Sequence, residues 1–224
     1  VGALGISALN IFMPFFLLFN GIGLLFGIGS GILISSEDGM GNKKKANQYF
    51  ATGFVSILSI AIILGLIWNY YLQPLCVILG ANSDTIDLVL EYGKCIMAFA
   101  PVFMMSNYFA PIVRNMKNPK LVMCAVLTGS VLNVILDYVF VFPMDMGMFG
   151  AAAATVIGSL TTLLVLSTHF IKKQNRVKIN KETISLNLLA PIFKCGFSSL
   201  IMEVASGFVI FIFNIQILKY IGNN

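Results

Sequence analysis

The sequence predicts an all-α polytopic membrane protein with six transmembrane helices. The chain is 58% hydrophobic and only 10% charged, whereas soluble domains carry about 25% charged residues. Its mean hydropathy is +0.91. The apolar residues gather in six runs, each about as long as the roughly 20 residues that a helix needs to cross a bilayer. These runs do not alternate between polar and apolar residues, so they do not fit the strands of a membrane β-barrel.

The apolar runs and the charges between them predict how the chain crosses the membrane. We place the spans at residues 10–35, 48–71, 92–113, 120–142, 148–171 and 190–219. Eleven Lys and Arg residues fall in the loops at residues 36–47, 114–120 and 172–189, and the alternate loops carry only acidic charges. The positive-inside rule places the three basic loops in the cytoplasm. We therefore expect a multi-pass protein of the plasma membrane.

Glycines in the first span predict close helix packing. Gly23, Gly27 and Gly31 recur every four residues, with Gly21 and Gly29 beside them. Small residues at this spacing let two helix backbones approach closely in lipid. A tight helix crossing is one interpretation, and a flexible or gating helix is the other.

Later spans contain further signals of packing and bending. Four prolines lie in or near spans: Pro14, Pro101, Pro111 and Pro191. Each lacks a backbone N–H and can kink a helix. Four consecutive alanines at residues 151–154 of the fifth span predict a second close contact between helices.

The fourth span holds the most informative residue of the chain. Asp137 is the only charged residue in the stretch from 121 to 142, and Asn133 lies four residues before it, on the same face of a helix. A carboxylate at membrane depth is costly and commonly marks an ion or substrate pathway. The pattern favours a site for a coupling ion. The alternative is a structural hydrogen bond between two helices.

Other classes of function lack the residues that they need. The four cysteines form no CxxC pair, and His169 is the only histidine, so we expect neither a metal site nor a disulfide framework. Neither a zinc-protease motif nor a Ser/His dyad is evident, so we predict no enzymatic activity and no cofactor besides a coupling ion. The net charge of +5 comes from short loop clusters rather than a basic stripe with aromatic platforms, so we expect no nucleic-acid partner. A purely structural membrane subunit would not need Asp137.

Five segments carry a resemblance to a known family. They read Leu-Gly-Ala at 79–81, Arg-Asn at 114–115, Asn-Pro-Lys at 118–120, Asn-Val-Ile-Leu-Asp at 133–137 and Met-Gly-Met-Phe-Gly-Ala-Ala-Ala-Ala-Thr at 146–155. In these segments the chain resembles the multidrug and toxic compound extrusion (MATE) transporters. The resemblance covers nearly the whole chain and is most specific between residues 75 and 160.

The resemblance implies a fold of twelve helices in two six-helix lobes. This chain would then supply spans two to seven, which predicts three parts. Residues 1–175 would form most of the N-terminal lobe, residues 176–189 a cytoplasmic linker, and residues 190–224 the first helix of the C-terminal lobe. Because the chain opens on Val1 inside an apolar run, we expect a piece of a longer protein. Its partners would include the missing spans as well as the lipid bilayer.

The resemblance also implies two cation sites. In one branch of the family the N-terminal lobe binds the coupling cation, H⁺ or Na⁺, at positions that match Asn133, Asp137 and Thr155. An Asp on the first span, which this chain does not cover, completes that cluster. Another branch carries a cation-binding Glu near the position of Glu203. The alternative for Glu203 is an acid that faces a water-filled cavity and attracts cationic substrates.

Residues of the third span are candidates for a substrate cavity. Met104, Met105 and Tyr108 offer polarizable and aromatic surfaces that suit small organic cations, and Asn107 is polar in mid-span. Core packing is the alternative for the first three, and a hydrogen bond between helices is the alternative for Asn107.

Together these features imply a cation-coupled antiporter that exports organic, mostly cationic drugs by alternating access. One alternative is a lipid-linked oligosaccharide flippase of the same superfamily, and another is a structural membrane subunit. A flippase needs basic residues in its central cavity to hold sugar-phosphate. The spans of this chain contain almost no internal cation and keep two acids, Asp137 and Glu203.

Overall fold

Helices make up almost all of the described chain. The computed structural model describes residues 2–171 and 184–221. Within these ranges there are seven α-helices, one short 3-10 helix and no strand: α1 (Gly2–Gly39), α2 (Lys43–Ile78), α3 (Ile86–Ala98), α4 (Ala100–Asn115), α5 (Pro119–Val141), α6 (Gly147–Ile171), η2 (Leu186–Leu188) and α7 (Leu189–Ile221). The predicted all-α class is confirmed.

Six crossings are present when α3 and α4 are counted as one bent span. Five other helices are long and apolar enough to cross a membrane, and α3 with α4 passes the same test with a bend of 56°. The span predicted at 92–113 was therefore too short, and its bend lies next to Pro101, one of the prolines expected to kink a helix. Proline cannot donate to the preceding turn and its ring crowds the carbonyl four residues back. Accordingly, α3 ends at Ala98 and α4 begins just before Pro101.

The first basic loop is shorter than predicted. Residues 36–47 were expected to be a loop, but only residues 40–42 lie between α1 and α2. Gly41 takes a positive φ of 81° there, a conformation that glycine adopts without strain. The helices extend further because the polar ends of membrane helices can project beyond the apolar layer while keeping their backbone hydrogen bonds.

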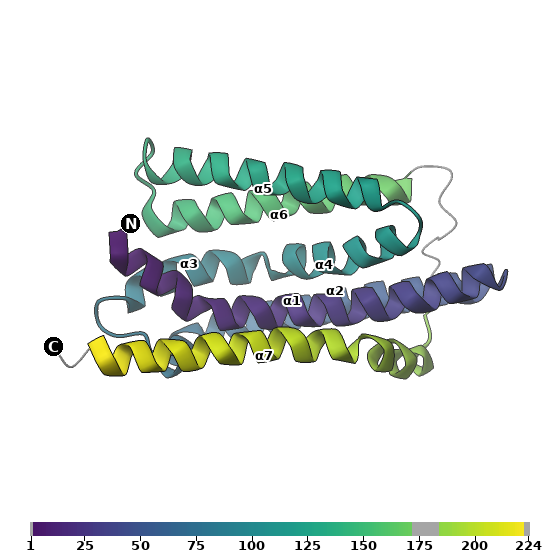
Figure 1. The fold of residues 1–224 in the computed structure, drawn as a ribbon, viewed down its shortest axis with the longest axis horizontal. Helices are drawn as coiled ribbons and strands as arrows, with labels where there is room; N and C mark the ends of the chain where they lie inside the picture. Colours follow the sequence, from purple (N-terminus) through teal and green to yellow (C-terminus); the bar gives the residue numbers. More distant parts are fainter. Residues whose placement is uncertain (1, 172–183, 222–224) are drawn as a thin grey trace.

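The connections lie alternately at the two ends of the bundle (Figure 1). The turn after α1, the turn after α4 and the ends of α6 and α7 that face residues 172–183 lie at one end. The connections after α2 and α5 lie at the other end. This is the up-and-down order that the charge pattern predicts, with the basic residues at 43–45 and 114–120 at one end.

The predicted linker can be compared with the structure only in part. Residues 176–183 lie outside the described residues. Beyond them, the backbone N–H of Ser185 donates to the hydroxyl of Thr52 at 3.1 Å, and η2 contacts α2. The helix α7 then packs along α1. The division of the chain into two lobes stays a prediction.

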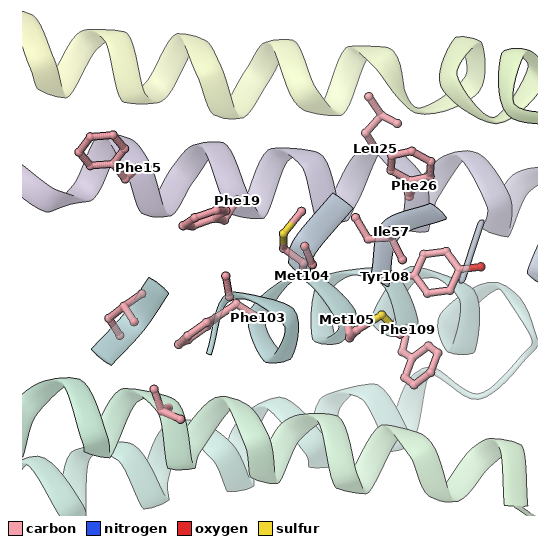
Figure 2. Close-up of a cluster of buried hydrophobic side chains, with 14 of the residues drawn as sticks. Phe15, Phe19, Leu25, Phe26, Ile57, Phe103, Met104, Met105, Tyr108 and Phe109 are labelled. Atoms are coloured by element: carbon pink, nitrogen blue, oxygen red, sulfur yellow. The ribbon is translucent and has the colours of Figure 1, made fainter. Parts of the chain in front are cut away.

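The helix α1 occupies the centre of the bundle. Half of its most apolar stretch is buried, against 11% for α5 and for α7. It contacts α2, α3, α4 and α7. Its large side chains, including Phe15, Phe19, Leu25 and Phe26, form a cluster with Ile57 of α2 and residues of α4 (Figure 2). The outer faces of α5 and α7 carry exposed apolar side chains, as expected of surfaces in contact with lipid or with further spans.

Glycines of α1 make two close helix crossings rather than one. On the face toward α4, a Cβ atom at Gly23 would lie 2.7 Å from Asn107 Cβ, and one at Gly27 would lie 2.5 Å from the Asn107 carbonyl oxygen. On the face toward α7, a Cβ atom at Gly29 would collide with the Ile192 carbonyl. The tight crossing that the spacing predicts is confirmed, and Gly29 belongs to a second one.

The second crossing is reciprocal, because α7 contributes a glycine of its own. A Cβ atom at Gly196 would collide with the carbonyl oxygen of Leu25. The two backbones therefore touch near the end that carries the basic loops. They are less close further along, where a Cβ atom at Gly207 would lie 3.7 Å from Pro14.

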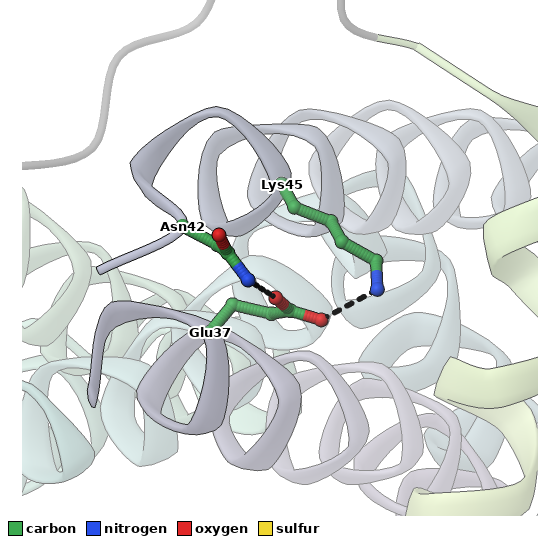
Figure 3. A network of polar contacts seen from close by, with 3 residues as sticks. All are labelled: Glu37, Asn42 and Lys45. Carbon is green, nitrogen blue, oxygen red and sulfur yellow. Dashed lines mark hydrogen bonds and ion pairs between the residues drawn. The ribbon is translucent and has the colours of Figure 1, made fainter. Parts of the chain in front are cut away.

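A polar network closes the turn between α1 and α2 (Figure 3). One carboxylate oxygen of Glu37 lies 2.7 Å from Lys45 Nζ, and the other accepts a hydrogen bond from Asn42 Nδ2 at 3.0 Å. The backbone N–H of Asn42 also donates to the Glu37 carbonyl at 2.8 Å. Glu37 is only 6% exposed. The network fixes the turn by satisfying a nearly buried carboxylate with two partners.

We expect Gly196→Ala to destabilise the protein by about 2 kcal/mol, because the added methyl forces two backbones apart. Thermal unfolding of the full-length protein in detergent would measure this. The matched control is Gly39→Ala, where a Cβ atom meets nothing within 4 Å. Equal melting temperatures for the two variants would contradict the close crossing.

Candidate functional site

The hairpin of α5 and α6 holds Asn133, Asp137 and Thr155. Asn118 begins α5: its side-chain oxygen accepts from the Leu121 N–H at 3.4 Å, and Pro119 follows at the first helical position. The amide of Asn118 also lies 3.2 Å from His169 Nδ1, near the end of α6. These contacts fix the two helices to each other at the end with the basic loops.

At the opposite end, α6 is fixed by α3. The carboxylate of Glu91 accepts a hydrogen bond from the backbone N–H of Phe149 at 3.2 Å. A carboxylate is favourable at this position because the first N–H groups of a helix lack partners within the helix. Both ends of α6 are therefore held, which fixes the height of Thr155 relative to α5.

Glycines bring the two helices together in the middle of the membrane. A Cβ atom at Gly158 would lie 2.8 Å from both Asn133 Cβ and the Gly129 carbonyl oxygen, and one at Gly129 would lie 2.6 Å from the Gly158 carbonyl oxygen. Only residues without a side chain fit this crossing. It places Asn133 of α5 opposite Thr155 of α6.

The structure joins two of the predicted site residues directly. Asn133 Nδ2 donates to Thr155 Oγ1 at 3.5 Å, a long hydrogen bond, and Thr155 Oγ1 donates to the Ala151 carbonyl at 2.9 Å. Both side chains are half-buried. Asn133 therefore keeps its amide oxygen free to accept from, or coordinate, another group.

Asp137 lies one helical turn from Asn133 but is not bonded to it. Its Oδ1 atom is buried and has no hydrogen-bond partner among the described residues. An unpartnered carboxylate oxygen inside an apolar helix bundle is costly unless a further group or a cation neutralises it. The residue is thus free to bind such a group.

Tyr92 is a neighbour of this site that sequence reasoning missed. Its phenol lies beside the Thr155 hydroxyl and near the Asp137 carboxylate. Its ring contacts Phe12 of α1 edge to face, with centroids 5.4 Å apart. Its position along the predicted spans could have indicated this. Tyr92 lies near the beginning of the third span and Asp137 near the end of the fourth, so both lie at the same end of the bundle.

Glu203 belongs to a different part of the bundle. It is half-buried on α7 and lies against α1. A Cβ atom added at Gly21 of α1 would lie 3.0 Å from the Glu203 Cβ. The helix α7 runs along one edge of the bundle and the α5–α6 pair along the opposite edge (Figure 1). The two predicted acids therefore do not form one site.

The four predicted substrate-cavity residues are packed in the core or hydrogen-bonded. Met104, Met105 and Tyr108 are buried in the cluster of Figure 2, and the Tyr108 hydroxyl donates to the Phe50 carbonyl at 2.8 Å. Asn107 Nδ2 donates to Asn20 Oδ1 at 2.7 Å, joining α4 to α1. These contacts agree with the packing and hydrogen-bond interpretations, and cavity lining stays a prediction.

A small pocket lies between α5 and α6 beside the Asn133–Thr155 pair. It has a volume of about 120 Å³ and is lined by Gly129, Ser130, Asn133, Thr155, Gly158, Ser159 and Thr162. Among the described residues no group of three or more His, Cys, Asp or Glu side chains could hold a metal ion. The pocket therefore offers neutral oxygen atoms, with the single carboxylate of Asp137 one turn away.

Comparison with known proteins identifies the family. The sequence model of the MatE family matches residues 1–139. The chain belongs to the MatE family. It is 32% identical over 226 residues to the multidrug export protein MepA of Staphylococcus aureus strain MSSA476, and 30% identical over 235 residues to MepA of Staphylococcus saprophyticus. These matches take in 97% and 100% of the chain, but only 49% and 51% of the two relatives. This MatE chain thus spans about half the length of the curated relatives that it matches.

Solved structures show the same fold. An inward-facing multidrug resistance MATE family transporter superposes with a TM-score of 0.88 over 93% of this chain and 48% of that protein, at 23% identity. An outward-facing multidrug resistance MATE family transporter superposes with a TM-score of 0.82 over 91% of this chain and 46% of that protein, at 24% identity. The expected MATE architecture is confirmed. The relatives are transporters rather than enzymes, which agrees with the predicted absence of enzymatic activity.

We expect the Asn20–Asn107 pair of this MatE chain to contribute about 1 kcal/mol of coupling energy, typical of hydrogen bonds between membrane helices. A double-mutant cycle with Asn20→Ala and Asn107→Ala, read by unfolding of the full-length protein, would measure it. Asn20→Ala combined with Asn133→Ala is the control and should be additive, because Asn133 pairs elsewhere. Additivity in both cycles would contradict the contact.

Proposed function

We propose that the full-length protein is a cation-coupled multidrug exporter, and that Asp137 binds the coupling cation. The observation that carries this proposal is the buried Asp137 Oδ1 without a partner. Support comes from relatives at 30–32% identity that are named multidrug export proteins. The activity is proposed for the whole protein, since the chain matches about half of these relatives.

The chemistry of the site suits reversible binding of H⁺ or Na⁺. Asp137 is the only charged residue between positions 121 and 142, so binding a cation removes most of the cost of keeping the carboxylate there. Asn133, one turn away on α5, and its partner Thr155 on α6 add neutral oxygen atoms. Neutral oxygens contribute coordination without the extra negative charge that would hold a cation too firmly to release.

Coupling requires only that the cation and the drug each prefer a different conformation. The cation then shifts the population toward the state that releases drug outward, by as much as its differential affinity for the two states. The membrane potential supplies about 2.3 kcal/mol per charge per 100 mV, and the ion gradient adds to this. No direct contact between drug and cation is needed.

Cationic organic molecules are the substrates that the charges favour. Glu203 is half-buried on α7, away from Asp137, and can attract a cation of its own. Its proximity to Gly21 places it against α1, the central helix. An anionic sugar-phosphate lipid would instead need basic side chains at this depth, which disfavours the flippase alternative.

We expect Asp137→Asn to reduce gradient-driven efflux of ethidium to the rate measured without a gradient, because an amide cannot neutralise a cation. The measurement uses the full-length protein in proteoliposomes with H⁺ and Na⁺ gradients imposed separately. Asp145→Asn is the matched control: Asp145 lies in the connection after α5 at a positive φ of 50°, which Asn tolerates. Gradient-driven efflux by Asp137→Asn at the wild-type rate would refute the proposal.

A further inference from the structure

Polar side chains from both helices line the pocket between α5 and α6. Ser130 and Asn133 line it from α5, and Thr155, Ser159 and Thr162 line it from α6. The three α6 residues are spaced four and three apart, so they share one face of the helix. We call this feature the α5–α6 groove and define it by these five side chains.

The groove exists because two glycines leave room for it. At Gly129 a Cβ atom would collide with the Thr162 hydroxyl, and at Gly158 it would lie 2.8 Å from Asn133 Cβ. Side chains at either position would fill the space or separate the helices. The close crossing and the adjacent polar space are thus produced by the same two residues.

The polar atoms of the groove are biased toward hydrogen-bond acceptors. The Thr155 hydroxyl donates its hydrogen to the Ala151 carbonyl at 2.9 Å, and Thr162 donates to the Gly158 carbonyl at 3.1 Å. Asn133 uses its amide N–H on Thr155. The Asn133 N–H takes one lone pair of Thr155, and the Tyr92 phenol lies beside that hydroxyl. The atoms left for a ligand are therefore chiefly the Thr162 lone pairs and the Asn133 amide oxygen. Ser130 and Ser159 make no hydrogen bond to another described residue, so their hydroxyls are available as well.

Such a surface needs water or a cation. Polar groups that face hydrocarbon without partners cost several kcal/mol each, so polar surface inside a bilayer is covered by protein or hydrated. A volume of about 120 Å³ holds several water molecules. Acceptor atoms without nearby cationic side chains favour a small cation with its waters over an anion.

The groove begins next to the proposed coupling site. Asn133 lines it and lies one turn from Asp137 on α5. From Thr155 it continues by seven residues to Thr162, which is about 10 Å along the helix axis. Because α6 runs toward the end with the basic loops (Figure 1), the groove extends from near Asp137 along the α5–α6 pair toward that end.

We propose that the α5–α6 groove is a hydrated binding path for a small monovalent cation, Na⁺ or hydronium, that extends from Asp137 along the two helices as far as Thr162. The inference rests on the proposed role of Asp137 and adds the route by which the cation reaches or leaves it. Ser159 and Thr162 are its positioning residues, because they supply oxygen atoms at the end remote from Asp137.

We expect Thr162→Val and Ser159→Ala each to slow gradient-driven drug efflux about tenfold, the effect of losing roughly one hydrogen bond to the moving ion. The affinity for ethidium, measured by fluorescence without a gradient, should not change. The assay uses the full-length protein in proteoliposomes. Thr161→Val is the matched control, because the Thr161 hydroxyl donates to the Ile157 carbonyl at 2.8 Å and does not line the groove.

Asp137→Asn in the same assay separates the two proposals. Wild-type rates for Ser159→Ala and Thr162→Val, with Asp137→Asn inactive, would overturn the groove and leave the coupling site intact. Wild-type export by Asp137→Asn would overturn the coupling site and the groove together. A parallel loss of ethidium affinity in the groove variants would also overturn the inference and assign the groove to the drug.

A second measurement does not depend on transport. In a cysteine-free background of the full-length protein, Ser159→Cys should react with aminoethyl methanethiosulfonate, a small cationic reagent, about tenfold faster than with its anionic sulfonatoethyl analogue. The reaction needs a thiolate, which forms where water reaches the sulfur. Thr161→Cys is the control and should react slowly with both reagents. No reaction at Ser159→Cys, or equal rates with the two reagents, would show that the groove is not a hydrated cation path.

Discussion

Contact between helix backbones is the interaction on which this bundle depends. In a bilayer the hydrophobic effect does not hold helices together, so close packing and a few polar contacts must do so. The central helix α1 achieves this on two faces, with Gly23 and Gly27 toward α4 and Gly29 toward α7. The reciprocal Gly196 on α7 makes the second contact closest near the end with the basic loops. The large side chains of α1 then fill the space that remains around these contacts.

Close helix packing at glycines also forms the candidate site, on the other side of the molecule. Gly129 and Gly158 bring α5 and α6 together, which sets Asn133 opposite Thr155 and leaves polar space beside them. The two residues that shorten the distance between these helices therefore also create the polar space in which we propose that a hydrated cation binds. Asp137 then adds one negative charge at the end of that surface.

Polar contacts at the two ends of the bundle hold this arrangement in place. Glu37, Asn42 and Lys45 close the turn between α1 and α2 (Figure 3). Glu91 holds the beginning of α6, and Asn118 contacts its last turn. These contacts lie near water, where charged groups cost little to keep, whereas the middle of the bundle contains mainly hydrogen bonds between neutral groups such as Asn20–Asn107. Asp137 and Glu203 are the two acids that depart from this pattern.

The sequence by itself predicted the six crossings, their order and the two acids within them, Asp137 and Glu203. Apolar length, basic loops and an acid inside an apolar run are local properties of the chain. The sequence also indicated the close packing of α1 from glycine spacing. It did not determine which helix each glycine meets, the break at Phe99, the short turn at residues 40–42 or the place of Tyr92. Those depend on the rotation and height of each helix against its neighbours, which are set by contacts between residues far apart in the chain. Only the tertiary structure therefore placed Glu203 against α1 and revealed the groove beside Asn133.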